Sequence, residues 1–350
     1  MKKLVTTIII LFLLTACQTT SIEPSVENAE DGHYWPTEGW LVSAPEDQGM
    51  DGQKLAAIAE YIEENNIAID SVLVVKDGYI VGEYYFNGYD QNELHVQYSV
   101  TKSITSALVG IALEEGSIEN IDQTLVDFFP NQDFLDESSK KITLEQILTM
   151  RTGLDWTEGN SGYYALMAAN DPVAYMLSLP VVEEPGNAFG YCSGCSFLLS
   201  AIVQESVGMN TADFAKEELF SPLGIDDFQW ETLSNGIPNG GWGLYLTPRD
   251  MAKFGYLYLN EGLWNGQQII PAAWVSASVE PVRPVSDTVG YGYQWWIFPE
   301  DRIYAAQGLY GQKIFVIPET NMVVVITADL GNESIEFTLL NDYILAAIDE

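Results

Sequence analysis

Residues 97–110 read QYSVTKSITSALVG, and this stretch decides how the rest of the chain is interpreted. It begins polar and becomes apolar within one turn, a pattern that predicts a largely buried helix. Lys102 stands in this helix although the whole chain holds only 14 Lys and Arg residues. Ser99 and Lys102 are spaced so that they share one face of the helix. The sequence therefore predicts a lysine that points back at a serine hydroxyl from an enclosed position.

A lysine enclosed in this way can act as a base. Burial in a low-dielectric environment disfavours the ammonium and lowers the pKa of the amine. The helix N-terminus adds positive potential at Ser99, which favours an oxyanion forming there. The same S-x-x-K pattern recurs at Ser138 and Lys141, but that copy lies in a charged segment without an apolar flank. We interpret the second copy as a solvated turn and Ser99 as the nucleophile.

Histidine, the usual base for an activated serine, is scarce in this sequence. His33 and His95 are the only two, and no G-x-S-x-G nucleophile elbow is present. The sequence therefore argues against a Ser-His-Asp enzyme and in favour of lysine as the base.

Two further stretches complete a pattern of three motifs. Residues 185–194 read PGNAFGYCSG and lead into an apolar helix, and residues 305–312 read AAQGLYGQ before a predicted strand. With Ser99 and Lys102, they resemble the S-x-x-K, Y-x-N or Y-x-S, and K-T-G elements of the serine β-lactamase and penicillin-binding protein superfamily. The resemblance spans roughly residues 45–348. It is closest to the class C-like branch, which includes esterases, D-amino-acid peptidases and 6-aminohexanoate-dimer hydrolases.

The resemblance implies a catalytic role for each matching residue. Ser99 would be the acylated nucleophile, and Lys102 would accept or relay its proton. Tyr191 would serve as general base and then protonate the leaving group. The backbone amides of Ser99 and Leu309 would form the oxyanion hole.

The resemblance also implies three substrate-binding residues, namely Ser193, Gln307 and Gly308. The third motif departs from the family pattern, because Ala306 stands where the family has Lys or His and Gln307 where it has Thr or Ser. Ala306 offers neither a charge nor a hydrogen-bond donor to a substrate carboxylate. We therefore expect neutral esters to be better substrates than β-lactams, with neutral or amine-bearing amides between them.

Strand and hairpin signals lie near both ends of the chain, with helical patterns between them. An Asp-Gly turn at residues 77–78 predicts a hairpin over residues 71–86, and residues 313–317 and 322–327 predict another. Residues 291–298 predict a further strand. The pattern predicts an α+β, β-lactamase/transpeptidase-like fold, with an antiparallel sheet built from both chain ends, flanking helices and an inserted helical domain. We assign residues 46–112 and 284–350 to the sheet domain and residues 113–283 to the helical domain.

The N-terminus has the pattern of an export signal. A basic start is followed by a short apolar run, residues 4–14, and by Leu14-Thr15-Ala16-Cys17, which resembles a bacterial lipobox. We predict a lipoprotein signal peptide over residues 1–16, lipidation at Cys17 and a polar tether over residues 17–45; the alternative is an ordinary signal with a chance cysteine. The protein would then be an exported, lipid-anchored envelope protein. In a Gram-negative cell Gln18 favours the outer membrane, facing the periplasm, because it stands where the inner-membrane retention signal has Asp.

Charge and cysteine content limit the partners and cofactors. The formal net charge of −36 disfavours nucleic acid and strongly anionic ligands. Cys192 and Cys195 form a C-x-x-C pair that either makes a disulfide or remains two buried thiols. Because the sequence has no second cysteine pair and only two histidines, a zinc site would lack ligands. We expect no metal and no cofactor.

These observations together predict a serine hydrolase that forms an acyl-enzyme on Ser99 and cleaves small neutral ester or amide bonds. One alternative is a β-lactamase or a D,D-peptidase that acts on peptidoglycan-type substrates. The other is a non-catalytic envelope protein that binds peptidoglycan or a partner. The sequence leaves the oligomeric state open.

Overall fold

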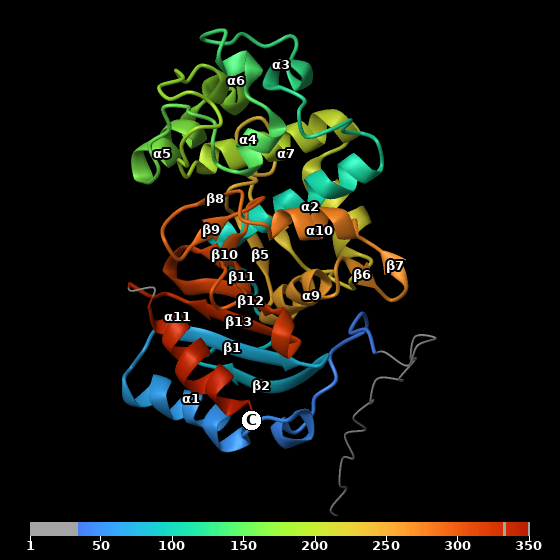
Figure 1. Ribbon diagram of the computed structural model, residues 1–350, viewed down its shortest axis with the longest axis vertical. Helices are drawn as coiled ribbons and strands as arrows, with labels where there is room; N and C mark the ends of the chain where they lie inside the picture. Colours follow the sequence, from blue (N-terminus) through green and yellow to red (C-terminus); the bar gives the residue numbers. More distant parts are fainter. Residues whose placement is uncertain (1–33, 332–333, 349–350) are drawn as a thin grey trace, which may run out of the picture.

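The computed structural model describes residues 34–331 and 334–348 (Figure 1). The predicted signal peptide, Cys17 and residues 17–33 of the predicted tether lie outside the described residues and stay predictions. Within the described ranges, no helix combines the length and the apolar character that crossing a bilayer requires.

An eight-stranded sheet forms the centre of the fold, and all of its strand pairs are antiparallel. Strand β1 from the N-terminal part pairs directly with β13 from the C-terminal part, so the sheet is built from both chain ends as predicted. From one edge to the other the strands are β2 (Tyr79–Tyr85), β1 (Ile69–Lys76), β13 (Met322–Ala328), β12 (Gln312–Ile317), β11 (Ile303–Gly308), β10 (Trp296–Phe298), β9 (Gly290–Tyr291) and β8 (Arg283–Pro284).

Each face of the sheet has its own hydrophobic core, because successive strand residues point to opposite faces. Val72 and Val74 of β1 belong to one core, and Leu73 and Val75 belong to the other. Helix α1 (Gly52–Glu64) and the C-terminal helical segment that begins with α11 (Ile335–Thr338) cover the first face (Figure 1). Helices α2 (Thr101–Glu114) and α9 (Pro248–Leu259) lie against the second face. Helix α2 is thereby enclosed, which agrees with its apolar sequence.

The remaining helices form a group beyond α2, away from the sheet (Figure 1). They are α3 (Leu125–Phe128), α4 (Leu144–Leu148), α5 (Asn160–Ala168), α6 (Pro172–Leu177), α7 (Ser193–Val207) and α8 (Thr211–Ala215), while α10 (Ala272–Ser278) packs on α2. Short strands β3 (His95–Val96), β5 (Leu244–Leu246) and β4 (Gln229–Trp230) make a separate small sheet, and β6 (Leu263–Trp264) pairs with β7 (Gln267–Gln268).

Helix α9 corrects the predicted domain boundary. It falls inside the range 113–283 assigned to the helical domain, yet it packs on the central sheet. Gly255 lies so close to β13 that a Cβ atom there would be 2.6 Å from a methyl carbon of Val323. The helical domain therefore ends before residue 248, because the apolar face of α9 is buried against strands.

The predicted tether and the predicted strand over residues 291–298 also need correction. Trp35 and Trp40 are buried in the core, and the Trp264 indole nitrogen donates a hydrogen bond to Thr37 Oγ1 at 2.8 Å. Residues 34–45 are thus part of the folded protein, because their aromatic side chains need burial. The strand is interrupted between β9 and β10, where Gln294 adopts a left-handed φ of 64° and donates a side-chain hydrogen bond to the Leu148 carbonyl.

Candidate active site

Ser99 and Lys102 make the contact that the sequence predicts. Ser99 lies in a 3₁₀ turn, Tyr98–Val100, that leads directly into α2, and Lys102 lies in the first turn of α2. The Lys102 side-chain nitrogen lies 2.8 Å from Ser99 Oγ, 2.9 Å from Ser193 Oγ and 2.7 Å from the Gly241 carbonyl oxygen. Only 1% of Lys102 is exposed to solvent. Its amine is therefore fixed between three oxygens at the position of a base for Ser99.

Burial changes the acid–base behaviour of Lys102. Desolvation lowers its pKa from 10.5 to about 7, although the nearby Glu158 carboxylate acts in the opposite direction. A large fraction of the amine is therefore neutral at neutral pH and can accept a proton from Ser99. His95, the histidine within the described residues, lies on β3, where burial lowers its pKa to about 4 and its ring packs on Tyr89.

Glu158 is a site residue that the sequence gave no means of selecting. It precedes α5, it belongs to no motif, and it is one of 50 acidic residues. Its carboxylate accepts hydrogen bonds from the Ser193 hydroxyl at 2.5 Å, the Ser193 amide at 3.0 Å, the Trp156 indole at 2.5 Å and the Tyr163 hydroxyl. Burial acts to raise the pKa of Glu158, but the Lys102 charge and these hydrogen bonds outweigh it, so its pKa is lowered. Ser193 thus bridges a carboxylate and the lysine amine.

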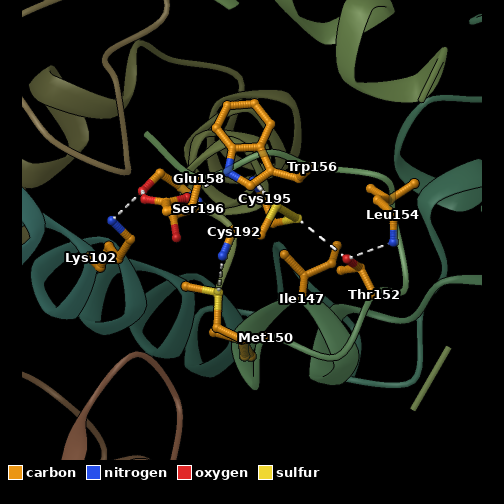
Figure 2. Close-up of a disulfide and its surroundings, with 12 residues drawn as sticks. Lys102, Ile147, Met150, Thr152, Leu154, Trp156, Glu158, Cys192, Cys195 and Ser196 are labelled. Carbon is orange, nitrogen blue, oxygen red and sulfur yellow. Dashed lines mark hydrogen bonds between the residues drawn. A yellow bond between two sulfur atoms is a disulfide. The ribbon is translucent and has the colours of Figure 1, made fainter. Parts of the chain in front are cut away.

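A disulfide between Cys192 and Cys195 closes the first turn of α7, with an S–S distance of 2.01 Å. This resolves the choice between a bridge and two buried thiols. Figure 2 shows Trp156, Glu158 and Lys102 close to the bridge. Because Ser193 lies inside the bridged turn and Tyr191 directly precedes it, the disulfide fixes the segment that carries both.

Tyr191 stands beside the lysine, as the second motif implies. The Lys102 nitrogen lies 4.9 Å from the centroid of the Tyr191 ring, which is a cation–π distance. The same ring stacks on Trp296 with centroids 5.7 Å apart and meets the edge of the Tyr291 ring at 6.2 Å. Two aromatic neighbours therefore fix the plane of Tyr191 next to the amine.

The third motif brings Leu309 opposite Ser99. Gly308 ends β11, and a Cβ atom there would lie 2.3 Å from the Gln97 carbonyl oxygen, so glycine allows β11 to approach the loop before Ser99. Tyr98 and Tyr310, which flank Ser99 and Leu309, have left-handed φ values of 43° and 61°. Their rings meet edge to face at 5.3 Å. Two strained residues in mutual contact thus flank the two proposed oxyanion donors.

A lysine lies beside the third motif, although it comes from a different strand than the family pattern would suggest. Lys313 on β12 is paired with Gln307 in the sheet register, and its ammonium donates to Gln307 Oε1 at 3.0 Å. The same ammonium lies 3.3 Å from a carboxylate oxygen of Glu336, and both of these side chains are buried. A hairpin of residues 303–308 with 312–317 would have placed Lys313 opposite Gln307, but the hairpin predicted from the sequence pairs residues 313–317 with 322–327 and does not include Gln307. Nothing in the sequence indicates Glu336, because it approaches from α11.

Ser99 and Leu309 lie where two cavities meet. The first cavity has a volume of about 230 Å³ and carries charged and amide groups, and the second has a volume of about 300 Å³ and is mainly apolar. The first, called the polar cavity below, is lined by Ser99, Glu158, Tyr163, Tyr191, Trp296, Gln307, Gly308, Leu309 and Lys313. The second, called the apolar cavity, is lined by Tyr98, Ser99, Tyr163, Tyr164, Met167, Ser193, Trp242, Leu309 and Tyr310.

The predicted catalytic and substrate-binding residues other than Lys102 line these cavities, and the buried Lys102 contacts Ser99 and Ser193 without lining either cavity. Cys17 lies outside the described residues. In the part of the chain that the structure describes, no group of three or more His, Cys, Asp and Glu side chains is placed to hold a metal ion.

Comparison with protein families matches residues 55–347 to the family described as Beta-lactamase. The chain belongs to the beta-lactamase family. This membership identifies it as a serine hydrolase with the β-lactamase/transpeptidase-like fold that the sequence predicts.

The proteins that are similar to this beta-lactamase family member are named for several different activities. The 6-aminohexanoate-dimer hydrolase of Paenarthrobacter ureafaciens is 24% identical over 300 residues, which cover 78% of this chain and 75% of the relative. A Bacillus anthracis protein to which the same activity is attributed has a TM-score of 0.74 at 26% identity, covering 92% of this chain and 89% of that one. A family VIII carboxylesterase has a TM-score of 0.69 at 16% identity, covering 83% and 94%, and shows the fold alone.

Proposed function

We propose that this protein hydrolyses small neutral esters or amides through an acyl-enzyme on Ser99. The observation that carries the proposal is the buried Lys102 nitrogen 2.8 Å from Ser99 Oγ, at the junction of two cavities. A binding protein gains nothing from a buried lysine with a lowered pKa beside a serine. For this reason the non-catalytic alternative is disfavoured.

The proposed reaction begins with transfer of the Ser99 hydroxyl proton to the neutral Lys102 amine as Oγ attacks the substrate carbonyl. The carbonyl oxygen becomes an oxyanion, which the amides of Ser99 and Leu309 stabilise. The proton passes by way of Tyr191 to the leaving group, and the bond between the carbonyl carbon and the leaving group breaks. Water then attacks the acyl-enzyme, with the same groups acting as base, and releases the acid and free Ser99.

The electrostatics of the polar cavity support neutral substrates. Ala306 is buried in the core and provides no charge, and the Lys313 ammonium is already paired with Glu336. A substrate carboxylate would also meet the Glu158 charge and a chain with a net charge of −36. Losing one charge-assisted contact costs about 1.5–3 kcal/mol, or on the order of 10- to 100-fold in kcat/KM.

A β-lactamase or D,D-peptidase is the second candidate, and the Lys313 ammonium on the polar cavity is the observation that favours it. The two candidate functions can be distinguished by kcat/KM values measured for three substrates, namely p-nitrophenyl butyrate, a chromogenic cephalosporin and a linear amide. We expect the neutral ester to exceed the cephalosporin at least tenfold, with the amide between them. A cephalosporin value equal to or above that of the ester would replace the esterase assignment with the β-lactamase one.

We further propose that the protein is exported and anchored to the cell envelope through a lipid on Cys17. The lipobox-like sequence before Cys17 motivates this, and the Cys192–Cys195 disulfide fits an oxidising compartment.

A further inference from the structure

The apolar cavity concentrates exposed apolar side chains on a strongly acidic protein. Of the eleven large hydrophobic side chains that are exposed in the described residues, four line this cavity: Tyr164, Met167, Leu309 and Tyr310. A cluster of exposed apolar side chains on the surface of a globular protein marks a binding site. Since Ser99 also lines the cavity, the cluster lies directly beside the nucleophile.

Aromatic contacts give this cavity a defined shape. The Tyr163 and Trp242 rings pack together with centroids 4.8 Å apart, and Tyr98 meets Tyr310 at 5.3 Å. Helix α5 contributes Met167, which is 43% exposed and completes the apolar lining. Apart from Ser99 and Ser193, the lining consists of four tyrosines, one tryptophan, one methionine and one leucine, whose rings and alkyl groups suit a hydrocarbon group.

The position of the proton donor decides which half of the substrate enters this cavity. The oxyanion donors Ser99 and Leu309 line both cavities, so they place the carbonyl at the junction. Tyr191 lines the polar cavity and is absent from the lining of the apolar one. Because a general acid must reach the leaving group, the leaving group lies in the polar cavity, and the acyl chain is directed into the apolar one.

We infer that the apolar cavity is an acyl-binding pocket and that the substrates are esters or amides of medium-length aliphatic or aryl-substituted acids. This inference rests on the proposed function. Size agrees with it: an engineered cavity of about 150 Å³ holds a benzene ring, and the apolar cavity has about 300 Å³. An acetyl group would leave most of this volume empty, whereas a hexanoyl or phenylacetyl group would bury its carbons against the aromatic walls.

Two substrate series test the assignment with the unmodified protein. In the first, p-nitrophenyl acetate, butyrate, hexanoate and phenylacetate share one leaving group. Each fully buried methylene contributes on the order of fourfold, so kcat/KM should rise at least tenfold from acetate to hexanoate. In the second series, alkyl acetates with lengthening alcohols, we expect less than a threefold rise. A flat acyl series, or a larger gain on the alcohol side, would overturn the assignment.

A pair of variants locates the effect. Met167→Asp places a carboxylate in the apolar cavity and should reduce the ratio of hexanoate to acetate kcat/KM at least fivefold. Leu135→Asp changes a residue that is 58% exposed and lines neither cavity, so it should leave this ratio unchanged. If circular dichroism shows that both variants are folded and their ratios of hexanoate to acetate kcat/KM are equal, the acyl chain does not bind in this pocket.

Labelling with a fluorophosphonate separates failure of this inference from failure of the proposed function. A protein that is not labelled on Ser99 is not the proposed hydrolase, and both proposals fail. A protein that is labelled on Ser99, hydrolyses esters and shows no acyl-length dependence contradicts the acyl-pocket assignment alone.

Discussion

Replacing Glu158 with Gln should move the pH dependence of catalysis to lower pH. The Ser193 hydroxyl bridges the two charges, 2.9 Å from the Lys102 nitrogen and 2.5 Å from the Glu158 carboxylate. The charges therefore lie roughly 5 Å apart, where an effective dielectric constant of about 20 gives an attraction of about 3 kcal/mol. At 1.36 kcal/mol per pKa unit, this attraction raises the pKa of Lys102 by as much as about two units.

The sign of the shift follows from the charge of each state. The carboxylate favours the protonated amine, so its removal lowers the Lys102 pKa further below about 7. Neutral amine then persists to lower pH, and the acid limb of the kcat/KM profile should move down by about one to two pH units. The Gln amide group can face the hydroxyls of Ser193 and Tyr163, which can accept as well as donate, so the fold should tolerate the change.

The assay is kcat/KM for p-nitrophenyl butyrate across the range from about pH 5 to pH 9. Glu137→Gln is the matched control, because this exposed residue pairs with Lys140, lines neither cavity and should leave the profile in place. An acid limb that stays fixed in folded Glu158→Gln protein, or moves to higher pH, would refute the electrostatic coupling of Glu158 to Lys102.

Three further predictions concern single substitutions. Lys102→Arg should reduce kcat/KM at least 10³-fold, since guanidinium cannot give up its proton. Wild-type-like rates in this variant would show that Lys102 acts only as a positive charge and not as a base. Glu336→Gln should release the Lys313 charge and raise kcat/KM for an ester with a terminal carboxylate, relative to its neutral analogue, by on the order of tenfold; an unchanged ratio would show that Lys313 does not reach the substrate. Cys17→Ser should move the protein from the membrane fraction to the soluble fraction on immunoblots, and continued sedimentation with membranes would indicate another attachment.

Local patterns in the sequence sufficed to predict the contact of Ser99 with Lys102 and the central sheet. Ser99 and Lys102 are close in sequence on one helix, so their contact follows from helical geometry. The Asp-Gly turn at residues 77–78 has positive φ at both positions, as its residue types predict. A sheet built from both chain ends could be predicted because the strand signals recognised in the sequence lie near those ends, and the pairing of β1 with β13 agrees with it.

Contacts between distant segments could not be predicted in this way. Glu158 reaches Ser193 from a loop 35 residues earlier, and Glu336 reaches Lys313 from α11, which follows the sheet in the chain. An acidic residue carries no local signal that distinguishes it from the others on an acidic surface. The boundary at α9 was misplaced for a related reason, because an amphipathic helix looks the same in sequence whether it packs on strands or on helices.

The intact mass of the protein after incubation with a fluorophosphonate shows whether Ser99 is the residue that carries the acyl group. We expect one adduct per chain, located on Ser99 by peptide mapping, and no adduct on folded Ser99→Ala protein treated in parallel. Wild-type protein that gains no mass, or an adduct that persists in Ser99→Ala, would contradict this role of Ser99.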